Sequence, residues 1–159
     1  MRFRLLLVGI AVPALLLGAL ASSALAGSYP SSWYKIFGHS TSCGLGAASI
    51  NNTTHKAGGV TENRHGCSHS NAYRSVPPYY LGVQTFIKGD DNYICNYSTL
   101  GWNTSTGKSV TRTVPWANPD LAIECQFLDV PYYGQTINYR DTDSDGLWYI
   151  QVKSPSKEF

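Results

Sequence analysis

Hydrophobic and polar residues alternate over short stretches of this chain, and Gly, Ser, Thr, Asn and Pro interrupt them throughout. No window carries apolar residues at i, i+3, i+4 and i+7 over three turns, which is the spacing of an amphipathic helix. The clearest strand-like stretch is residues 79–87, and residues 88–91, which contain Gly89, separate it from a second stretch at 92–97. Two such stretches joined by a short glycine-containing turn predict an antiparallel hairpin.

Further strand-like stretches follow toward the C-terminus. They cover residues 108–114, 121–130, 135–140 and 147–152. Asp145-Gly146 lies between the last two and is typical of a tight turn. Six short strands in so small a region predict an all-β fold, either a small antiparallel β-sandwich or a barrel.

The N-terminal part has a different composition. Residues 41–71 are rich in Gly, Ser, Thr, Asn and His and hold few large aliphatic side chains, so we expect a long N-terminal loop region there. Residues 27–38 form an aromatic arm ahead of a single β-rich domain at 39–159. The arm could pair as an edge strand or insert into a binding partner.

The first 26 residues have the order of a secretory signal peptide. Arg2 and Arg4 precede an apolar stretch at residues 5–20, and Ala24-Leu25-Ala26 is a small-x-small cleavage site. The apolar stretch is shorter than the roughly 20 residues that a spanning helix needs. We therefore expect a secreted, extracellular protein of bacterial style that does not stay in a membrane once the signal is removed.

Four cysteines, Cys43, Cys67, Cys95 and Cys125, follow the signal. An even number in an exported chain predicts two disulfides, and the shortest loops pair Cys43 with Cys67 and Cys95 with Cys125. Zinc binding is the other use of cysteine, but it favours C-x-x-C spacing, which this chain lacks.

The charge balance is informative about partners. Charged residues are 14% of the chain, and the loss of Arg2 and Arg4 leaves ten Lys and Arg against ten Asp and Glu. A protein that binds phosphate backbones carries a basic surplus. We therefore expect no nucleic-acid partner.

Alternate aspartates precede Gly146. Asp141, Asp143 and Asp145 resemble the opening of an EF-hand calcium loop, where carboxylates converge on the ion and glycine allows a sharp turn. The glutamate that closes such a loop would fall at position 152, which is Val152. Calcium could thus be a cofactor, although a solvated acidic β-turn explains the same residues.

Two histidines, His65 and His69, flank Cys67, and Glu62 precedes them. A His/Glu pair could perform acid–base chemistry, and histidines four apart could share a metal on a helix. The glycine and serine between them favour a polar loop beside a disulfide instead. No catalytic residue is therefore assigned, and we expect a protein that is not an enzyme.

Aromatic residues are 13% of the chain, with 11 Tyr and 4 Trp. Their rigid rings with polar tips suit protein interfaces and sugar stacking. On a strand, one of two adjacent tyrosines should face away from the core. The candidate binding residues are Trp33, Tyr34, Phe37, Tyr79, Tyr80, Tyr132 and Tyr133.

Taken together, these features favour a secreted, non-enzymatic binding or adaptor module that docks on another extracellular protein, for example as a subunit of a secreted toxin or adhesion assembly. Two alternatives stay open. One is a carbohydrate or cell-wall binding module, and the other is a small secreted hydrolase or toxin that uses the loop of His65 and His69.

Overall fold

A computed structural model describes residues 29–39, 41–89, 91–116, 125 and 131–158. Within these residues the chain forms strands and no helix, as the sequence pattern predicts. The strands are β1 (Tyr29–Pro30), β2 (Tyr34–His39), β3 (Ser42–Asn51), β4 (Lys56–Arg64), β5 (Leu81–Gly89), β6 (Ile94–Tyr97), β7 (Gly101–Trp102), β8 (Ser109–Pro115), β9 (Pro131–Thr142), β10 (Gly146–Lys153) and β11 (Lys157–Glu158).

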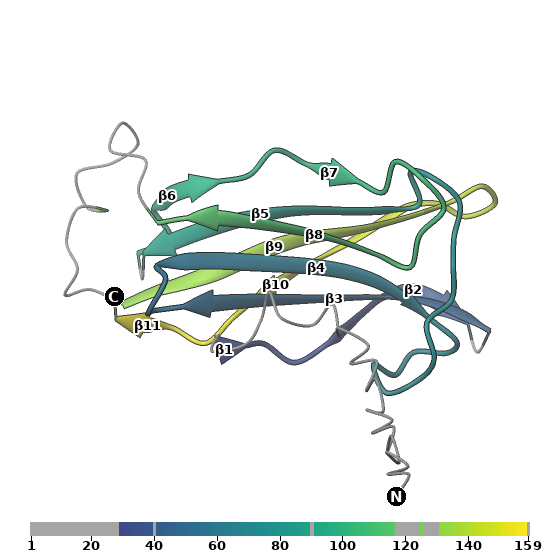
Figure 1. The fold of residues 1–159 in the computed structure, drawn as a ribbon, viewed down its shortest axis with the longest axis horizontal. Coiled ribbons are helices and arrows are strands. Elements are labelled where there is room, and N and C mark those ends of the chain that lie inside the picture. Colours follow the sequence, from purple (N-terminus) through teal and green to yellow (C-terminus); the bar gives the residue numbers. More distant parts are fainter. Residues whose placement is uncertain (1–28, 40, 90, 117–124, 126–130, 159) are drawn as a thin grey trace, which may run out of the picture.

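The strands form two antiparallel sheets that run along the long axis of the molecule (Figure 1). One sheet has the order β1-β3-β4-β8, with β2 also paired to β3. The other has the order β10-β9-β5-β6, with β11 paired to β9 and β7 to β5. The all-β sandwich is therefore confirmed, and its barrel alternative is excluded because the sheets do not close on each other.

Both predicted hairpins are present. β5 and β6 pair antiparallel, with a register shift between Ile87 and Lys88. β9 and β10 also pair antiparallel, and Thr142 lies opposite Gly146 next to the turn. β8 covers the stretch predicted at 108–114. The strand predicted at 121–130 lies outside the described residues, apart from Cys125.

The prediction of a long N-terminal loop region is wrong for residues 42–64, which form the β3–β4 hairpin. The small residues that suggested a loop let the two sheets approach closely. A Cβ atom added to Gly46 would lie 2.5 Å from Asn138 Cγ, and one added to Gly59 would lie 2.4 Å from Thr136 Cγ2. Glycine is needed here because side chains of β9 occupy the space.

The N-terminal arm also belongs to this sheet. Tyr29 and Pro30 lie opposite Ile50 and Ser49 of β3, and β2 pairs with the other half of β3. The described part of the arm thus follows the edge-strand interpretation, since backbone hydrogen bonds of β3 hold it.

The interior between the sheets is partly polar. Asn138 is fully buried, and its Nδ2 donates to Val60 O at 2.7 Å and to Thr61 Oγ1 at 2.9 Å. Thr136 Oγ1 donates to Asn138 Oδ1 at 2.6 Å, and Thr61 Oγ1 donates to Gly82 O at 2.7 Å. These bonds join the sheets and satisfy groups that would be costly to bury alone. The apolar core lies on either side of them, in clusters around Ile50 and Leu81.

Two disulfides join Cys43 to Cys67 and Cys95 to Cys125, with Cα–Cα distances of 5.1 and 5.3 Å. The pairing predicted from loop length is confirmed. Such bonds persist in oxidising compartments, so they are compatible with an extracellular protein. Among the residues that the structure describes, no helix is long and apolar enough to cross a membrane.

Candidate functional site

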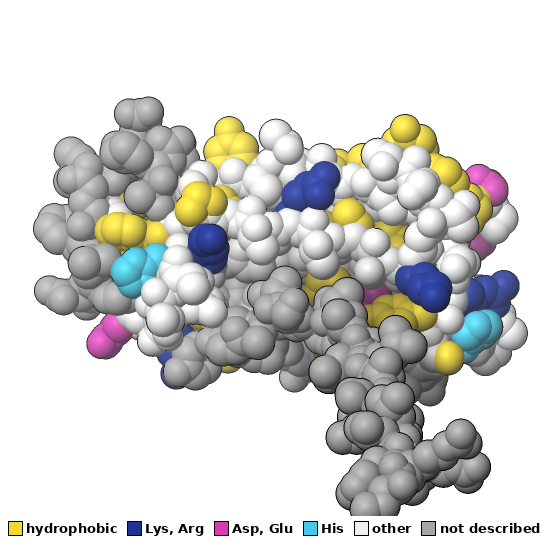
Figure 2. Space-filling model, in the orientation of Figure 1, with side chains coloured by type: hydrophobic (Ala, Val, Ile, Leu, Met, Phe, Trp, Pro, Cys, Tyr) yellow, Lys and Arg dark blue, Asp and Glu magenta, His cyan; other side chains and the backbone are white. Residues whose placement is uncertain are grey.

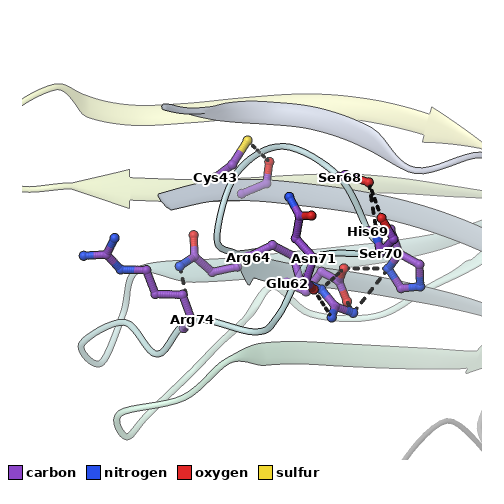
Figure 3. A network of polar contacts seen from close by, with 10 residues as sticks. Cys43, Glu62, Arg64, Ser68, His69, Ser70, Asn71 and Arg74 are labelled. Carbon is purple, nitrogen blue, oxygen red and sulfur yellow. Dashed lines mark hydrogen bonds and ion pairs between the residues drawn. The ribbon is translucent and has the colours of Figure 1, made fainter. Parts of the chain in front are cut away.

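A compact polar cluster lies where β4 ends and residues 65–73 fold back (Figure 3). Arg64 binds the Glu62 carboxylate through two nitrogens, Nε to Oε1 at 2.7 Å and Nη2 to Oε2 at 3.0 Å. His69 Nδ1 lies 2.7 Å from the same Oε1. Glu62 and His69, which the sequence offered as one possible His/Glu pair, are therefore in contact, whereas His65 is exposed.

The contacts of this cluster hold the loop of residues 65–73 against the end of β4. Glu62 is only 1% exposed, so Arg64 and His69 occupy its carboxylate and shield it from solvent. Arg64 Nη1 donates to Asn71 O at 2.8 Å, and the Trp33 ring stacks on His69 at 4.1 Å. These contacts fit the interpretation of a polar loop beside a disulfide, and the hydrolase alternative stays a prediction.

Tyr73 completes the cluster. Its ring lies 3.3 Å from the guanidinium carbon of Arg64, within cation–π range. Burial raises the pKa of the Tyr73 hydroxyl, and the negative charge of Glu62 raises this pKa further. The Tyr73 hydroxyl thus stays protonated around neutral pH, and its uncharged ring packs against the Arg64–Glu62 ion pair.

The acidic turn between β9 and β10 borders a pocket of about 300 Å³. Tyr80 OH donates to Asp143, and Ser144 Oγ donates to Asp145 Oδ2 at 3.1 Å. No three His, Cys, Asp or Glu side chains of the described residues are placed to hold a metal ion. Calcium binding by Asp141, Asp143 and Asp145 stays an untested alternative to a solvated acidic turn.

Arg140 also lines this pocket and is 6% exposed. Its Nη1 donates to Phe37 O at 2.6 Å, and its Nη2 donates to Ser42 Oγ at 2.8 Å. Burial lowers the pKa of this guanidinium, and the charge of Arg74 adds to the effect. Arg140 therefore ties β9 to β2 and β3 at this end of the sandwich.

Two of the predicted binding residues are not at the surface. Tyr132 and Tyr133 are 0% and 5% exposed. The expectation that one of two adjacent tyrosines on a strand faces solvent is therefore wrong for this pair. Tyr132 faces the core, while Asn92 accepts a hydrogen bond from the Tyr133 hydroxyl at 2.6 Å and Lys153 lies over the Tyr133 ring. Their neighbours cover both sides of β9, which is an inner strand of its sheet.

The other predicted aromatic residues do not form one cluster, although Phe37 and Tyr80 line the same pocket. Tyr34 and Tyr79 are more than half exposed, Trp33 stacks on His69, and Phe37 stacks on Trp148 at 4.7 Å. Tyr80 lines the pocket beside the acidic turn. Trp33 and Phe37 thus stack on His69 and Trp148, which are not among the predicted binding residues.

An aromatic row that sequence reasoning missed crosses the six-stranded sheet. Trp102 of β7 lies opposite Gly82 of β5, Gly82 lies opposite Tyr139 of β9, and Tyr139 lies opposite Tyr149 of β10. The ring centroids of Trp102 and Tyr139 are 5.8 Å apart, and those of Tyr139 and Tyr149 are 5.9 Å apart. We call these three side chains the aromatic row.

Gly82 allows the row to be continuous. A Cβ atom at this position would lie 2.9 Å from Trp102 Cε3 and Cζ3, so the indole lies directly over the backbone of β5. The ring therefore rests on the sheet surface, between the edge strand and Tyr139. Tyr149, at the other end of the row, is 62% exposed.

The row lies on the outer face of the six-stranded sheet, which faces away from the core. Along β5, Val83, Thr85 and Ile87 are buried, whereas Gln84 and Phe86 are partly exposed. We use outer face for the outward side chains of β5, β7, β9 and β10. Beyond the row they include the amides Gln84, Gln135 and Gln151 and the cations Lys88 and Lys153.

The sequence does carry a signal for part of this row. If Thr142 and Gly146 flank the turn of the last hairpin, counting back along both strands places Tyr139 opposite Tyr149. Trp102 could not be found in this way, because its position over Gly82 depends on a register shift in the β5–β6 hairpin and on a second shift between β6 and β7.

Comparison with known proteins adds no family to this description, since no family model, curated protein or solved structure matches the chain. On the side drawn in Figure 2, Lys and Arg side chains are spread over the face and do not form one continuous patch. The expectation of no nucleic-acid partner stays a prediction.

Proposed function

We propose that this protein is a carbohydrate-binding module that holds a glycan against the outer face of the six-stranded sheet. The aromatic row of Trp102, Tyr139 and Tyr149 carries the proposal, because it places three rings side by side on the outer face, where Tyr149 is exposed and Trp102 and Tyr139 are half-buried. Carbohydrate binding is one of the alternatives that the sequence left open.

A sugar ring has C–H groups on its faces and hydroxyl groups around its edge. The C–H groups pack on the negative face of an aromatic ring, and the hydroxyls need hydrogen-bond partners. The aromatic row supplies the first kind of contact. The amides of Gln84 and Gln151 lie on the same face, half-buried and exposed respectively, and an amide can both donate and accept.

The row is arranged before any ligand arrives. Trp102 is confined by Gly82 beneath it and by Tyr139 beside it, so binding would immobilise few additional rotamers. A preorganised surface loses less conformational entropy on association than a mobile one. This favours binding of a weakly interacting, hydroxyl-rich ligand.

A protein partner is the second candidate, and β10 favours it. This strand lies at the edge of its sheet and exposes Leu147 and Trp148 by 53% and 44%. An exposed edge can accept an added strand through main-chain hydrogen bonds. That arrangement corresponds to the adaptor module predicted from the sequence.

The proposal is tested by retention on insoluble polysaccharides and by affinity electrophoresis in soluble ones, with cellulose, chitin, xylan and peptidoglycan as probes. Tyr149→Ala removes the most exposed ring of the row, and Tyr34→Ala removes a comparably exposed tyrosine from the other sheet. We expect Y149A to weaken binding about tenfold, which corresponds to about 1.4 kcal/mol, and Y34A to bind as the wild type.

Melting temperatures of both variants show that each is folded. Retention on none of the probes, or equal losses in Y149A and Y34A, would contradict the proposal. Equal binding by Y149A and the wild type would place any glycan site elsewhere. If either result is obtained, capture of a stoichiometric protein partner through β10 would support the protein-binding function instead.

A further inference from the structure

Two lysines lie together at the opposite end of the outer face from the aromatic row. Lys88 of β5 lies opposite Tyr133 of β9, and Lys153 of β10 lies opposite Gln135. The ammonium of Lys153 lies 4.8 Å from the centre of the Tyr133 ring. Both cations therefore approach the same point of the sheet, around Tyr133.

In the part of the chain that the structure describes, no carboxylate forms an ion pair with Lys88 or Lys153. Neither lysine takes part in the ion pairs of Glu62 with Arg64 and His69. Burial lowers the pKa of Lys88, and the neighbouring charge of Lys153 lowers this pKa further. Two close cations repel each other, and an anion between them would reduce that cost.

The face between the two ends can accommodate an extended ligand. Tyr133 and Tyr139 belong to one strand, and at about 3.4 Å per residue the lysine pair lies roughly 20 Å from the aromatic row. Gln135 lies between them but is buried, and its Nε2 donates to Gln151 Oε1 at 3.0 Å. The exposed Gln151 and the half-buried Gln84 place amides along the middle of the face.

We infer that the glycan bound by the outer face is acidic, with an oxyanion of the sugar chain held between Lys88 and Lys153 while neighbouring sugar rings pack on the aromatic row. This inference rests on the proposed carbohydrate function and specifies its ligand. Rings at one end, amides in the middle and paired cations at the other end match a polymer with apolar sugar faces, hydroxyls and regularly spaced negative groups. An ammonium is a point charge, so carboxylate, sulfate and phosphate are equivalent ligands for it.

The test compares matched polymers that differ only in charge. Affinity electrophoresis is run with polygalacturonate against its fully methyl-esterified form, and with dextran sulfate against dextran. The variant is Lys88→Gln/Lys153→Gln, and the control is Lys35→Gln/Lys56→Gln, which removes two exposed lysines from the other sheet. Both double variants have the same net charge, so a general effect of charge moves them equally.

The wild type should bind the anionic member of at least one pair roughly tenfold more tightly at low salt, and the preference should shrink as added salt screens the lysines. K88Q/K153Q should lose the preference, whereas K35Q/K56Q should keep it. Preference for polygalacturonate alone would identify a carboxylate ligand, and preference for dextran sulfate alone would identify a sulfate.

Three outcomes would overturn the inference. Equal binding of neutral and anionic members by the wild type would refute the acidic ligand and leave the carbohydrate function intact. An unchanged preference in K88Q/K153Q would place the anion elsewhere. Binding of no polymer at all would refute both this inference and the proposed function. A loss of binding in Y149A, measured in the same gels, distinguishes the contribution of the aromatic row from that of the lysines.

Discussion

Gly59→Ala is the sharpest test of how the two sheets pack. The added Cβ would lie 2.4 Å from Thr136 Cγ2, 2.5 Å from Thr85 Oγ1 and 3.0 Å from Val83 Cγ2. Ordinary contacts between such atoms are about 3.5–4.0 Å, so the sheets or the side chains must move by roughly 1 Å.

Neither threonine can move freely. Both are 0% exposed, Thr85 Oγ1 donates to Arg112 O at 3.1 Å, and Thr136 Oγ1 donates to Asn138 Oδ1 at 2.6 Å. Overpacking of a tight interior destabilises a protein by about 1–3 kcal/mol. Replacing glycine with alanine also stabilises the protein by about 0.4–1 kcal/mol, because it lowers the conformational entropy of the unfolded chain, but this gain is smaller. We expect a net loss of about 1–2 kcal/mol.

The measurement is a thermal melt followed by circular dichroism with the disulfides intact, supported by urea titration. At roughly 3–4 °C per kcal/mol for a domain of this size, the midpoint should fall by roughly 3–8 °C. Gly89→Ala is the matched control, because this buried strand glycine would place its Cβ no closer than 3.9 Å to Tyr132. It should melt at or slightly above the wild type. Equal melting of G59A and G89A would refute the close approach of the sheets at β4.

Three further predictions concern single positions. Gly82→Ala should displace the Trp102 ring, because the added Cβ would lie 2.9 Å from it. The variant should therefore show shifted tryptophan fluorescence and weaker glycan retention, whereas G89A should match the wild type in both. Wild-type fluorescence and retention in G82A would contradict the role of Gly82. Asn138→Asp should destabilise the fold by about 3 kcal/mol at pH 7, because a buried carboxylate would face Val60 O and Thr61 Oγ1. Burial raises the pKa of such a group, so the variant should regain stability near pH 4, and a pH-independent loss would argue against this contact. Micromolar calcium should leave the melting temperature unchanged relative to EDTA, since Asp143 and Asp145 already accept bonds from Tyr80 and Ser144, and a gain of several degrees would reveal a calcium site.

Local features of the sequence were sufficient for several elements. The β5–β6 and β9–β10 hairpins follow from alternation around short turns with glycine. The cysteine pairing follows from loop length, because the two bonds that formed close the shorter loops. In each case the partners are near in sequence, so the information needed is contained within one short window.

The β3–β4 hairpin shows where such windows mislead. Its glycines, serines and alanines have the composition of a loop, yet they form the centre of a sheet. Gly46 and Gly59 are small because Asn138 and Thr136, distant in sequence, fill the adjoining space. Only the packing of one sheet on the other decides which small residues are interior.

The same reason separates the predicted binding residues from the aromatic row. Tyr132 and Tyr133 form a conspicuous pair in the sequence, but both are buried on an inner strand with neighbours on each side. Trp102, Tyr139 and Tyr149 are inconspicuous singly and meet because β7, β5, β9 and β10 pair in one register. The sequence by itself determined the hairpins that close on short turns and the disulfides, whereas the tertiary structure decided which small residues are interior and which rings meet on the outer face, because strand order and sheet packing bring together residues that are distant in the sequence.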